Sequence, residues 1–492
     1  MPIETLVLGA GLPVLLALLC VAFASRPTAA IPALLLVELG AAAGIAPGIA
    51  LGAIALYPGD LLAVALAAAT ALRWRNRACD RHLKRLLLAF IAVLALSVVR
   101  GVLAFGLEES VAAARELLGF ATAAVFFSTV STTPRLIRSV RTWLLAASVV
   151  VLVGALGFWF ERGLGTYQGS GERALNGLQA LVVLLAVVVT IIFPLFHGPI
   201  LRWALPAGGL VVLVLSTQRT VWAAAVVAAA VLLGTRPKGR ARAEVNRTRL
   251  VALGAALAVV LLVAAGPQGA RRDLTTGYQR ATGEETTFSW RLEGWTELID
   301  RQFSGTALDL MIGSPSGTGE TRLINGTSVE VAAHSMYVST FTMTGIIGVA
   351  LLIWAYLAAF VANRRRLLSN STFVARAAVL FMVLLALDLT YFVGYSSGAM
   401  SGLILGLACG LTGIAIQDPT STGPDKRAGA ESDEGDADKG DTDEADTDET
   451  DTDAEADEAS SPPARERPPA RTLIADPFHL LTGPESSPPA QG

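Results

Sequence analysis

Apolar runs of about 17–25 residues recur from Leu6 to Ile416, and each is long enough to cross a bilayer as a helix. Of the 492 residues, 53% are hydrophobic and 16% are charged, whereas soluble domains carry about 25% charged residues. Inside a bilayer every backbone polar group needs an internal partner, so these runs predict helices. We therefore expect an all-α polytopic integral membrane protein with about 12 transmembrane helices. Residues 1–58 are broken by Pro47 and Pro58 and fit either two or three spans.

The acidic residues are concentrated at the C-terminus. Residues 418–492 hold 21 acidic and 6 basic side chains, a net charge of −15, whereas residues 1–417 hold 20 acidic and 32 basic side chains, a net charge of +12. A Thr, Asp, Glu and Ala repeat with Pro-rich pieces cannot bury enough apolar surface to fold. We expect a multi-span membrane domain at 1–417 and a disordered, acidic and Pro-rich cytoplasmic tail at 418–492. The apolar stretch Thr472–Leu481 is either a docking peptide or part of that featureless tail.

Basic clusters between the apolar runs set the expected orientation. Four of them stand out, at Arg73–Arg85, Arg135–Arg141, Arg236–Arg249 and Arg364–Arg366. Because Lys and Arg are enriched in cytoplasmic loops, we expect all four on the cytoplasmic side. The expected spans are then residues 86–100, 112–130, 142–160, 177–196, 248–266, 341–362, 374–392 and 396–417. This alternation makes the polar-leaning segment 267–340 one large extracytoplasmic loop.

The apolar stretch at 201–233 is interrupted by the sequence Ser216-Thr-Gln-Arg219-Thr220. As a single span it would put Arg73–Arg85 and Arg135–Arg141 outside, against the charge rule. As two short spans that meet at 216–220, it leaves every basic cluster inside. Irregular backbone at membrane depth is tolerated where it lines a cavity, so we expect Arg219 at the outer mouth of a cavity. The alternative is an arginine that extends to the outer headgroups.

The external loop is expected to contain an amphipathic helix followed by a turn-rich segment. One face of that helix would be apolar, with Leu292, Trp295, Leu298, Ile299 and Phe303. Such a helix can lie on the membrane surface with its tryptophan at headgroup level. The segment Gly313–Gly319 resembles a phosphate loop only superficially, because it lacks the GxxxxGK[ST] pattern and follows no predicted strand. No nucleotide site is predicted there.

The loop ends in Ala-His334-Ser-Met-Tyr337, directly before an apolar run. This position predicts that His334 lies at a membrane–water boundary. An imidazole, with an ordinary pKa of about 6.5, can act there as a base, or it can be a helix-capping or interface residue. The three cysteines lie far apart in or beside apolar runs, which indicates small buried hydrophobes. The loop has no Asp-x-Asp and no His/Cys ligand set, so no metal site is predicted.

Taken in order, these motifs resemble the O-antigen ligase and O-antigen polymerase superfamily of bacterial envelope glycosyltransferases. The similar features are Ser-Thr-Gln-Arg219-Thr between short spans, an external loop with Arg291 and Trp295, a Gly-rich turn, and Ala-His334-Ser-Met-Tyr337 before a span with Gly345 and Gly348. The sequence Arg173-Ala-Leu-Asn176 is also similar to the polar motif that precedes a helix in that family.

This resemblance covers most of residues 60–417 and is specific only at 216–222 and 288–348. It implies a multi-helical membrane fold grouped with the GT-C glycosyltransferases. Two features depart from the family pattern. The family usually has Asn after the histidine, where this chain has Ser335, and the acidic tail is not a family feature.

The resemblance implies a metal-independent enzyme of the plasma (inner) membrane that uses a glycan on undecaprenyl diphosphate at the outer face. Arg219 and Arg291, with Arg173 as a third candidate, would bind the diphosphate, because arginine offers fixed bidentate donors to phosphate oxygens. His334 would be the catalytic base for the acceptor hydroxyl, or would only orient the acceptor. Arg291 could instead only anchor the surface helix. No cofactor is implied.

The resemblance leaves open whether the enzyme is a ligase or a polymerase, with a glycan or a lipid-linked glycan as acceptor. The partners expected are donor, acceptor and membrane lipids, and no nucleic acid. The rival function is a transporter or a lipid-linked glycan flippase, although the inverted repeat with paired broken helices found in many transporters is not visible in the sequence. A scaffold or regulatory protein is a third possibility that the acidic tail suggests.

Overall fold

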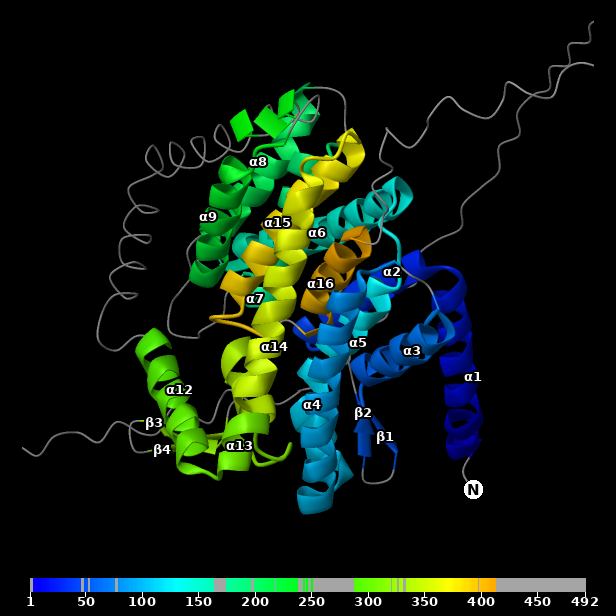
Figure 1. Cartoon of the computed structure of the whole chain (residues 1–492), viewed down its shortest axis with the longest axis vertical. Helices are drawn as coiled ribbons and strands as arrows, with labels where there is room; N and C mark the ends of the chain where they lie inside the picture. Colours follow the sequence, from blue (N-terminus) through cyan, green and yellow to red (C-terminus); the bar gives the residue numbers. More distant parts are fainter. Residues whose placement is uncertain are drawn as a thin grey trace, which may run out of the picture. The chain divides into compact units, whose positions relative to one another are not determined.

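The structure of the chain is a computed structural model. It describes residues 3–45, 48–51, 54–75, 78–162, 174–195, 199–216, 218–237, 242–243, 245–246, 249–250, 287–319, 321–324, 327–330, 333–396 and 398–412. Most of these residues are helical, and five helices, α4, α5, α6, α14 and α15, are long and apolar enough to cross a membrane. The expected helical membrane protein is confirmed at this level (Figure 1).

The helices follow one another with short connections. The first half of the chain forms α1 (Ile3–Ser25), α2 (Ala30–Ala42), α3 (Pro58–Leu72), α4 (Arg81–Phe105), α5 (Leu107–Ser128) and α6 (Pro134–Arg162). The second half forms α7 (Gly177–Ile192), α8 (Pro199–Leu215), α9 (Arg219–Gly234), α12 (Thr287–Ser304), α13 (Ala307–Ile312), α14 (Met336–Arg366), α15 (Thr372–Tyr391) and α16 (Gly398–Thr412).

The apolar stretch at 201–233 divides as predicted. Helix α8 ends at Leu215 and α9 begins at Arg219, so the break falls in the Ser-Thr-Gln-Arg sequence. The first 58 residues contain two helices, α1 and α2, joined by a short 3-10 turn at Pro27–Ala29. The span expected at 248–266 and the acidic tail lie outside the described residues.

Two small hairpins depart from the all-α expectation. Strand β1 (Ile49–Leu51) pairs antiparallel with β2 (Ile54–Leu56), and β3 (Thr321–Ile324) pairs antiparallel with β4 (Thr327–Glu330). Both lie between helices rather than inside a helical run, because a backbone that leaves the helical conformation must find partners for its N–H and C=O groups in a neighbouring segment. Only the second hairpin lies near the candidate site.

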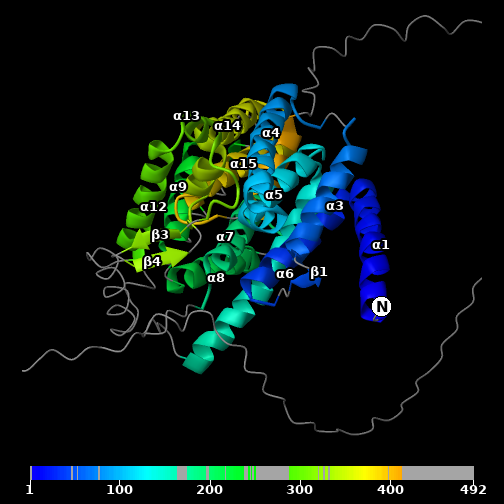
Figure 2. The ribbon, with the colours of Figure 1, turned by 90° about the horizontal axis from the view of Figure 1, so that it is seen from below.

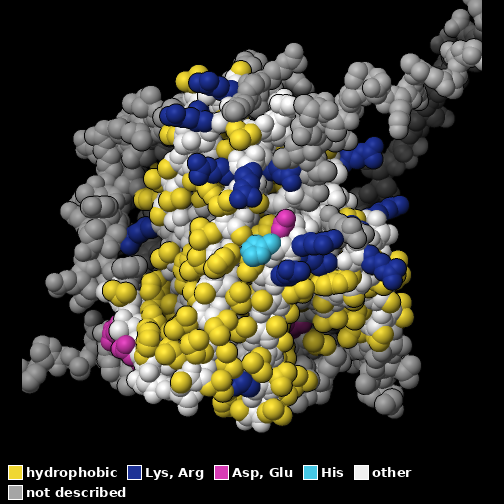
Figure 3. Space-filling view, in the orientation of Figure 1, with side chains coloured by type: hydrophobic (Ala, Val, Ile, Leu, Met, Phe, Trp, Pro, Cys, Tyr) yellow, Lys and Arg dark blue, Asp and Glu magenta, His cyan; other side chains and the backbone are white. Residues whose placement is uncertain are grey.

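Arginine side chains join several helix ends at one end of the described helices, which we call the basic end. Arg73 donates to Ala24 O at the end of α1, and Arg141 donates to Phe193 O and Pro194 O after α7. Arg366 and Arg376 bind carbonyls at the ends of α16 and α7. Cations at helix C-termini satisfy carbonyls that lack an intrahelical partner. Figure 3 shows Lys and Arg gathered away from the lower edge of this face.

At the opposite end, α12, α13, β3 and β4 pack beside the beginning of α14, and we call this the loop end (Figures 1 and 2). Helix α14 is kinked at Gly345, whose φ is 63° and ψ −165°, a conformation available essentially to glycine alone. A Cβ on Gly345 would lie 2.4 Å from the Met311 carbonyl carbon, so the kink lets α13 approach the α14 backbone closely.

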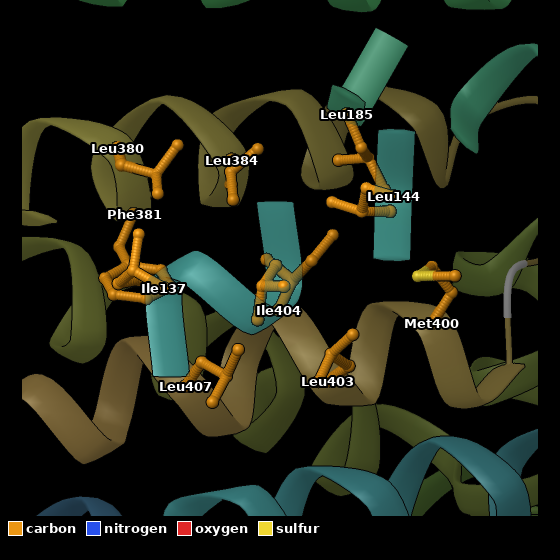
Figure 4. A pocket seen from close by; sticks show the side chains of 11 residues that line it. Ile137, Leu144, Leu185, Leu380, Phe381, Leu384, Met400, Leu403, Ile404 and Leu407 are labelled. Carbon is orange, nitrogen blue, oxygen red and sulfur yellow. The ribbon is translucent and has the colours of Figure 1, made fainter. Parts of the chain in front are cut away.

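The interior between the helices is apolar. A cavity of about 20 Å³ lies between α6, α7, α15 and α16, and only apolar side chains line it, among them Leu144, Leu384 and Met400 (Figure 4). Without polar groups it stays dry. Nearby, the buried Asp388 accepts hydrogen bonds from the hydroxyls of Tyr356 and Ser401, which links α14, α15 and α16. Asp388 therefore joins helices, as its position in a span suggested.

Candidate functional site

The turn after α15 is where the segments of the candidate site meet. Phe392 O accepts from Met336 N at 3.0 Å and from Ser335 Oγ at 3.1 Å, which fixes the beginning of α14. Gly394 O accepts from Arg291 Nη1 at 3.0 Å, which fixes α12. The Tyr395 hydroxyl donates to Gln218 Oε1 at 2.7 Å, next to the beginning of α9. Residues 392–395 thus connect three segments that are far apart in the sequence.

Helix α12 confirms the helix predicted in the external loop, but its apolar face is only partly covered. Trp295 and Leu298 are buried with Ala333 and Val338 in a small cluster, and Trp295 Nε1 donates to Ala333 O at 2.5 Å. Leu292 and Phe303, on the same predicted face, stay 50% and 60% exposed. Trp295 is therefore an anchor inside the protein rather than a side chain at headgroup level.

Arg291 lies on α12 between this cluster and the turn after α15. Besides its hydrogen bond to Gly394 O, its guanidinium lies 5.3 Å from the centre of the Tyr395 ring. The Nε atom is buried and has no hydrogen-bond partner, and within the described residues Arg291 forms no ion pair. Its charge is thus held in place without a carboxylate beside it.

His334 is the one described residue other than glycine with a positive φ, at 50°. For most side chains the left-handed region costs about 1–2 kcal/mol, and such strain is concentrated at functional positions. Ser335 rather than His334 is the N-cap residue of α14. The strained backbone therefore directs the imidazole away from a capping position.

Burial, followed by the positive charges of Arg291 and Arg322, lowers the pKa of His334 from 6.5 to about 4. The imidazole is therefore neutral at pH 7 and can accept a proton or a hydrogen bond. Arg291 and His334, 43 positions apart in the chain, are within electrostatic range of each other, as the proposed site requires.

Sequence reasoning missed Arg322. It lies on β3, is 1% exposed, and its guanidinium is 5.6 Å from the centre of the Trp290 ring. The available signal was the Asn325-Gly326 dipeptide between two short strand-like runs, which is the usual sequence mark of a hairpin. That hairpin would have placed Arg322 a few residues in space from the segment that leads to His334.

Arg219 is exposed at the first position of α9. Its neighbour Gln218 is buried and donates from Nε2 to Leu175 O at 2.6 Å, so the α8–α9 break is fastened to the beginning of α7. A Cβ on Gly394 would lie 2.4 Å from Thr220 Oγ1, so α9 begins directly against the turn that also binds Arg291. The structure thus brings the Arg219 segment and Arg291 to opposite sides of Gly394.

The Gly-rich segment 313–319 is a structural clasp rather than a phosphate loop. Ser97 Oγ donates to Ser314 O at 2.9 Å, and Ser316 N and Oγ donate to Ser97 O and Ser110 O. Arg100 on α4 pairs with Asp309 on α13 at 2.6 Å. The Thr306 hydroxyl and then Arg100 hold the pKa of Asp309 below its usual range. The loop end is therefore fastened to α4 and α5.

The third arginine proposed from sequence, Arg173, lies outside the described residues, although Asn176 caps α7 by accepting from Gln179 N. Among the described residues, no group of three His, Cys, Asp or Glu side chains is placed to hold a metal ion. Comparison of the sequence with models of known protein families, and with curated proteins, finds no match.

Proposed function

We propose that the chain is an envelope glycosyltransferase of the O-antigen ligase or polymerase type, which transfers a glycan from a polyprenyl diphosphate to an acceptor hydroxyl. The observation that supports this best is the meeting of Arg291 and a neutral, strained His334 at one end of a membrane-embedded helical body. A cation without a carboxylate partner suits an anionic leaving group, and a neutral imidazole beside it suits proton transfer.

The leaving group of this reaction is a lipid diphosphate, on which negative charge grows as the glycosidic bond breaks. Arg291 would bind its oxygens with guanidinium N–H groups that the Gly394 carbonyl and Tyr395 ring hold in position. Arg219 is exposed on the other side of the Gly394 turn and would bind the same diphosphate. Arg173 remains a third candidate, proposed from sequence alone.

His334 would accept the proton of the acceptor hydroxyl. A base with a pKa of about 4 is weak at neutral pH, but this value belongs to a site without an anion. A bound diphosphate would offset the positive charge of Arg291 and raise the pKa of His334 toward 6.5. The base would then be strongest when the donor is in place. An attack would form a new glycosidic C–O bond, release the lipid diphosphate and leave the proton on His334.

The finer topology belongs to the same proposal. We place the loop end outside, the basic end and the tail in the cytoplasm, and about 12 helices in the plasma membrane. The basic end fits the cytoplasmic side because Arg73, Arg141 and Arg366 gather there. Segment 267–340 would then be the catalytic loop.

Thiol labelling tests this orientation. Thr296→Cys and Thr318→Cys, both at exposed positions of the loop end, should react with an impermeant maleimide in intact cells. Asn370→Cys, exposed at the basic end, should react only after the cells are permeabilised. A parent chain without Cys20, Cys79 and Cys409 supplies the background. Labelling of Asn370→Cys alone in intact cells would reverse the topology and remove the proposed donor side.

The decisive experiment is to incubate the purified protein with an undecaprenyl-diphosphate glycan and a set of acceptors. Glycosyl transfer releases undecaprenyl diphosphate, which mass spectrometry detects, and the acceptor that gains the glycan separates ligase from polymerase. The His334→Ala variant is the matched control. If the wild type and this variant release equal amounts of diphosphate, the proposed mechanism is wrong.

The rival function, transport or flipping of a lipid-linked glycan, requires a passage large enough for the solute. The apolar cavity between α6, α7, α15 and α16 has a volume of about 20 Å³, about that of one water molecule, and offers no polar group to a sugar (Figure 4). This observation favours the transferase over the transporter.

A further inference from the structure

Arg322 has no role in the proposal so far, although it is among the largest fully buried side chains of the described residues. A buried arginine is expensive to place unless the surroundings use its charge or its hydrogen bonds. Its position on β3, within a loop rather than in a membrane helix, means that the chain could have left it in solvent. The burial therefore calls for a function.

The contacts of Arg322 are directed at the helix that holds the site. A Cβ on Gly294 would lie 2.7 Å from Arg322 Nε and 2.9 Å from its Cδ, so the side chain packs directly on the α12 backbone. Gly294 is three residues from Arg291 and adjacent to Trp295, which holds Ala333, the residue before His334. Arg322 is thus wedged between the diphosphate-binding candidate and the His334 turn.

We propose that Arg322 is a positioning residue: its buried guanidinium braces α12 behind His334 and supplies a fixed positive charge, so that His334 takes up a proton only when an anion is bound in front of Arg291. This inference rests on the proposed function for its meaning in catalysis. Its electrostatic content does not, because the two arginines and the imidazole are present without any substrate.

The charged groups near His334 support this role. Arg291 from α12 and Arg322 from β3 are the charged side chains of the described residues that act on the imidazole, and both are positive. The α14 and α15 segments packed against it bring Ser335 and Phe392, which carry no charge. A bound anion would therefore change the sign of the balance, since nothing described on these elements offsets the two cations.

A titration of His334 in the full-length protein tests the proposal without any transfer assay. Histidine labelled with ¹³C reports the protonation midpoint by NMR in detergent micelles, and the His334→Gln variant assigns the signal. In Arg322→Met the midpoint should rise by about one pH unit, the lower range of the effect of a nearby charge. Arg322→Lys, which keeps the charge, should stay close to the wild type.

Arg301→Met is the matched control. Arg301 also contacts β3, through Nη2 to Thr321 O at 2.5 Å, but it is exposed and does not act on His334. Its removal should leave the midpoint unchanged. Inorganic diphosphate, used as the anion probe, should raise the midpoint of the wild-type protein and should do so less in Arg291→Ala.

The proposal is overturned if folded Arg322→Met titrates like Arg301→Met. If Arg322→Met does not fold, Gly294→Ala is the second variant, because the added methyl group displaces the guanidinium while keeping its charge in the chain. That variant should show a smaller rise, and an unchanged midpoint there would equally overturn the proposal. Wild-type transfer activity with no shift in either variant would remove this inference and leave the proposed function intact.

Discussion

Arginines occupy both ends of the described helices, and they are used differently. At the basic end, Arg73, Arg141 and Arg376 donate to backbone carbonyls at the ends of α1 and α7. At the loop end, Arg291 and Arg322 lie close enough to His334 for their charges to act on its imidazole. The first group completes helix ends, whereas the second creates a positive field that an anion would relieve.

The difference shows that an arginine count alone is a poor guide to a binding site in a membrane protein. A guanidinium that meets helix-end carbonyls already has the partners that its charge requires. Two guanidiniums that meet a neutral imidazole raise the electrostatic energy of the empty site. The loop end is therefore the place where substitutions should change chemistry, and the basic end the place where they should change stability.

The largest expected effect is that of His334→Ala. Removing the proton acceptor while Arg291 stays in place should lower transfer by about 10²–10⁴-fold, the usual contribution of general base catalysis. Binding of the donor should survive, because the diphosphate contacts come from arginines. Initial rates of lipid diphosphate release, together with a donor-binding titration, measure the two quantities. Full transfer activity in this variant would erase the distinction between the two ends.

The next effect concerns the planar shape of the guanidinium. Arg291→Lys and Arg219→Lys keep a positive charge but lose the bidentate fork. A charge-assisted hydrogen bond contributes about 1.5–3 kcal/mol, so the kcat/KM for the donor should fall by about 10–100-fold. Arg141→Lys at the basic end should lower the thermal midpoint and leave the donor KM unchanged. Equal losses of kcat/KM in all three would contradict the contrast between the ends.

Stability should respond to the kink that fits the loop end to α14. Gly345→Ala forces a side chain into a conformation that costs about 1–3 kcal/mol, and its Cβ would meet the Met311 backbone. We expect a lower thermal unfolding midpoint. Gly154→Ala on α6 has nothing within 4 Å of the new methyl group and should stabilise slightly. A Gly345→Ala protein as stable as the wild type would show that the kink is not required.

The smallest effect is expected in the pH dependence of the rate. His334 must be neutral to act as a base, so activity falls as it becomes protonated at low pH. In the free enzyme its pKa is about 4, so kcat/KM should stay level down to about pH 5 and fall below that. A bound diphosphate raises the pKa, so the kcat profile should fall at a higher pH, nearer 6.5. Identical acid limbs in the two profiles would rule out the proposed coupling.

Several elements were predictable because their signals are local. The break between α8 and α9, the helix over residues 290–303 and the beginning of a long helix after His334 follow from apolar periodicity and from polar interruptions of it. Hydrophobic length also predicted the membrane-embedded helices. In each case the neighbours in sequence are the neighbours in space.

Other features depend on contacts between distant segments. The surface position predicted for Trp295 was wrong because Ala333 and Val338 cover it, although an amphipathic helix looks the same in sequence whichever surface covers its apolar face. The burial of Arg322 and the Gly394 turn that joins Arg291 to Gln218 were not predicted. Short hairpins and turns have weak signals, and their partners lie up to 177 positions away.

By itself, the sequence determined a helical membrane protein, the positions of its helix breaks, and Arg219, Arg291 and His334 as the side chains to examine. These follow from hydrophobic length and charge placement, which act on each segment separately. Only the tertiary structure decided that the turn at 392–395 joins the segments of these residues, that His334 is strained, and that a buried Arg322 lies beside them. Electrostatic coupling falls with distance in space, and distance in space is set by packing between segments that the chain order keeps apart.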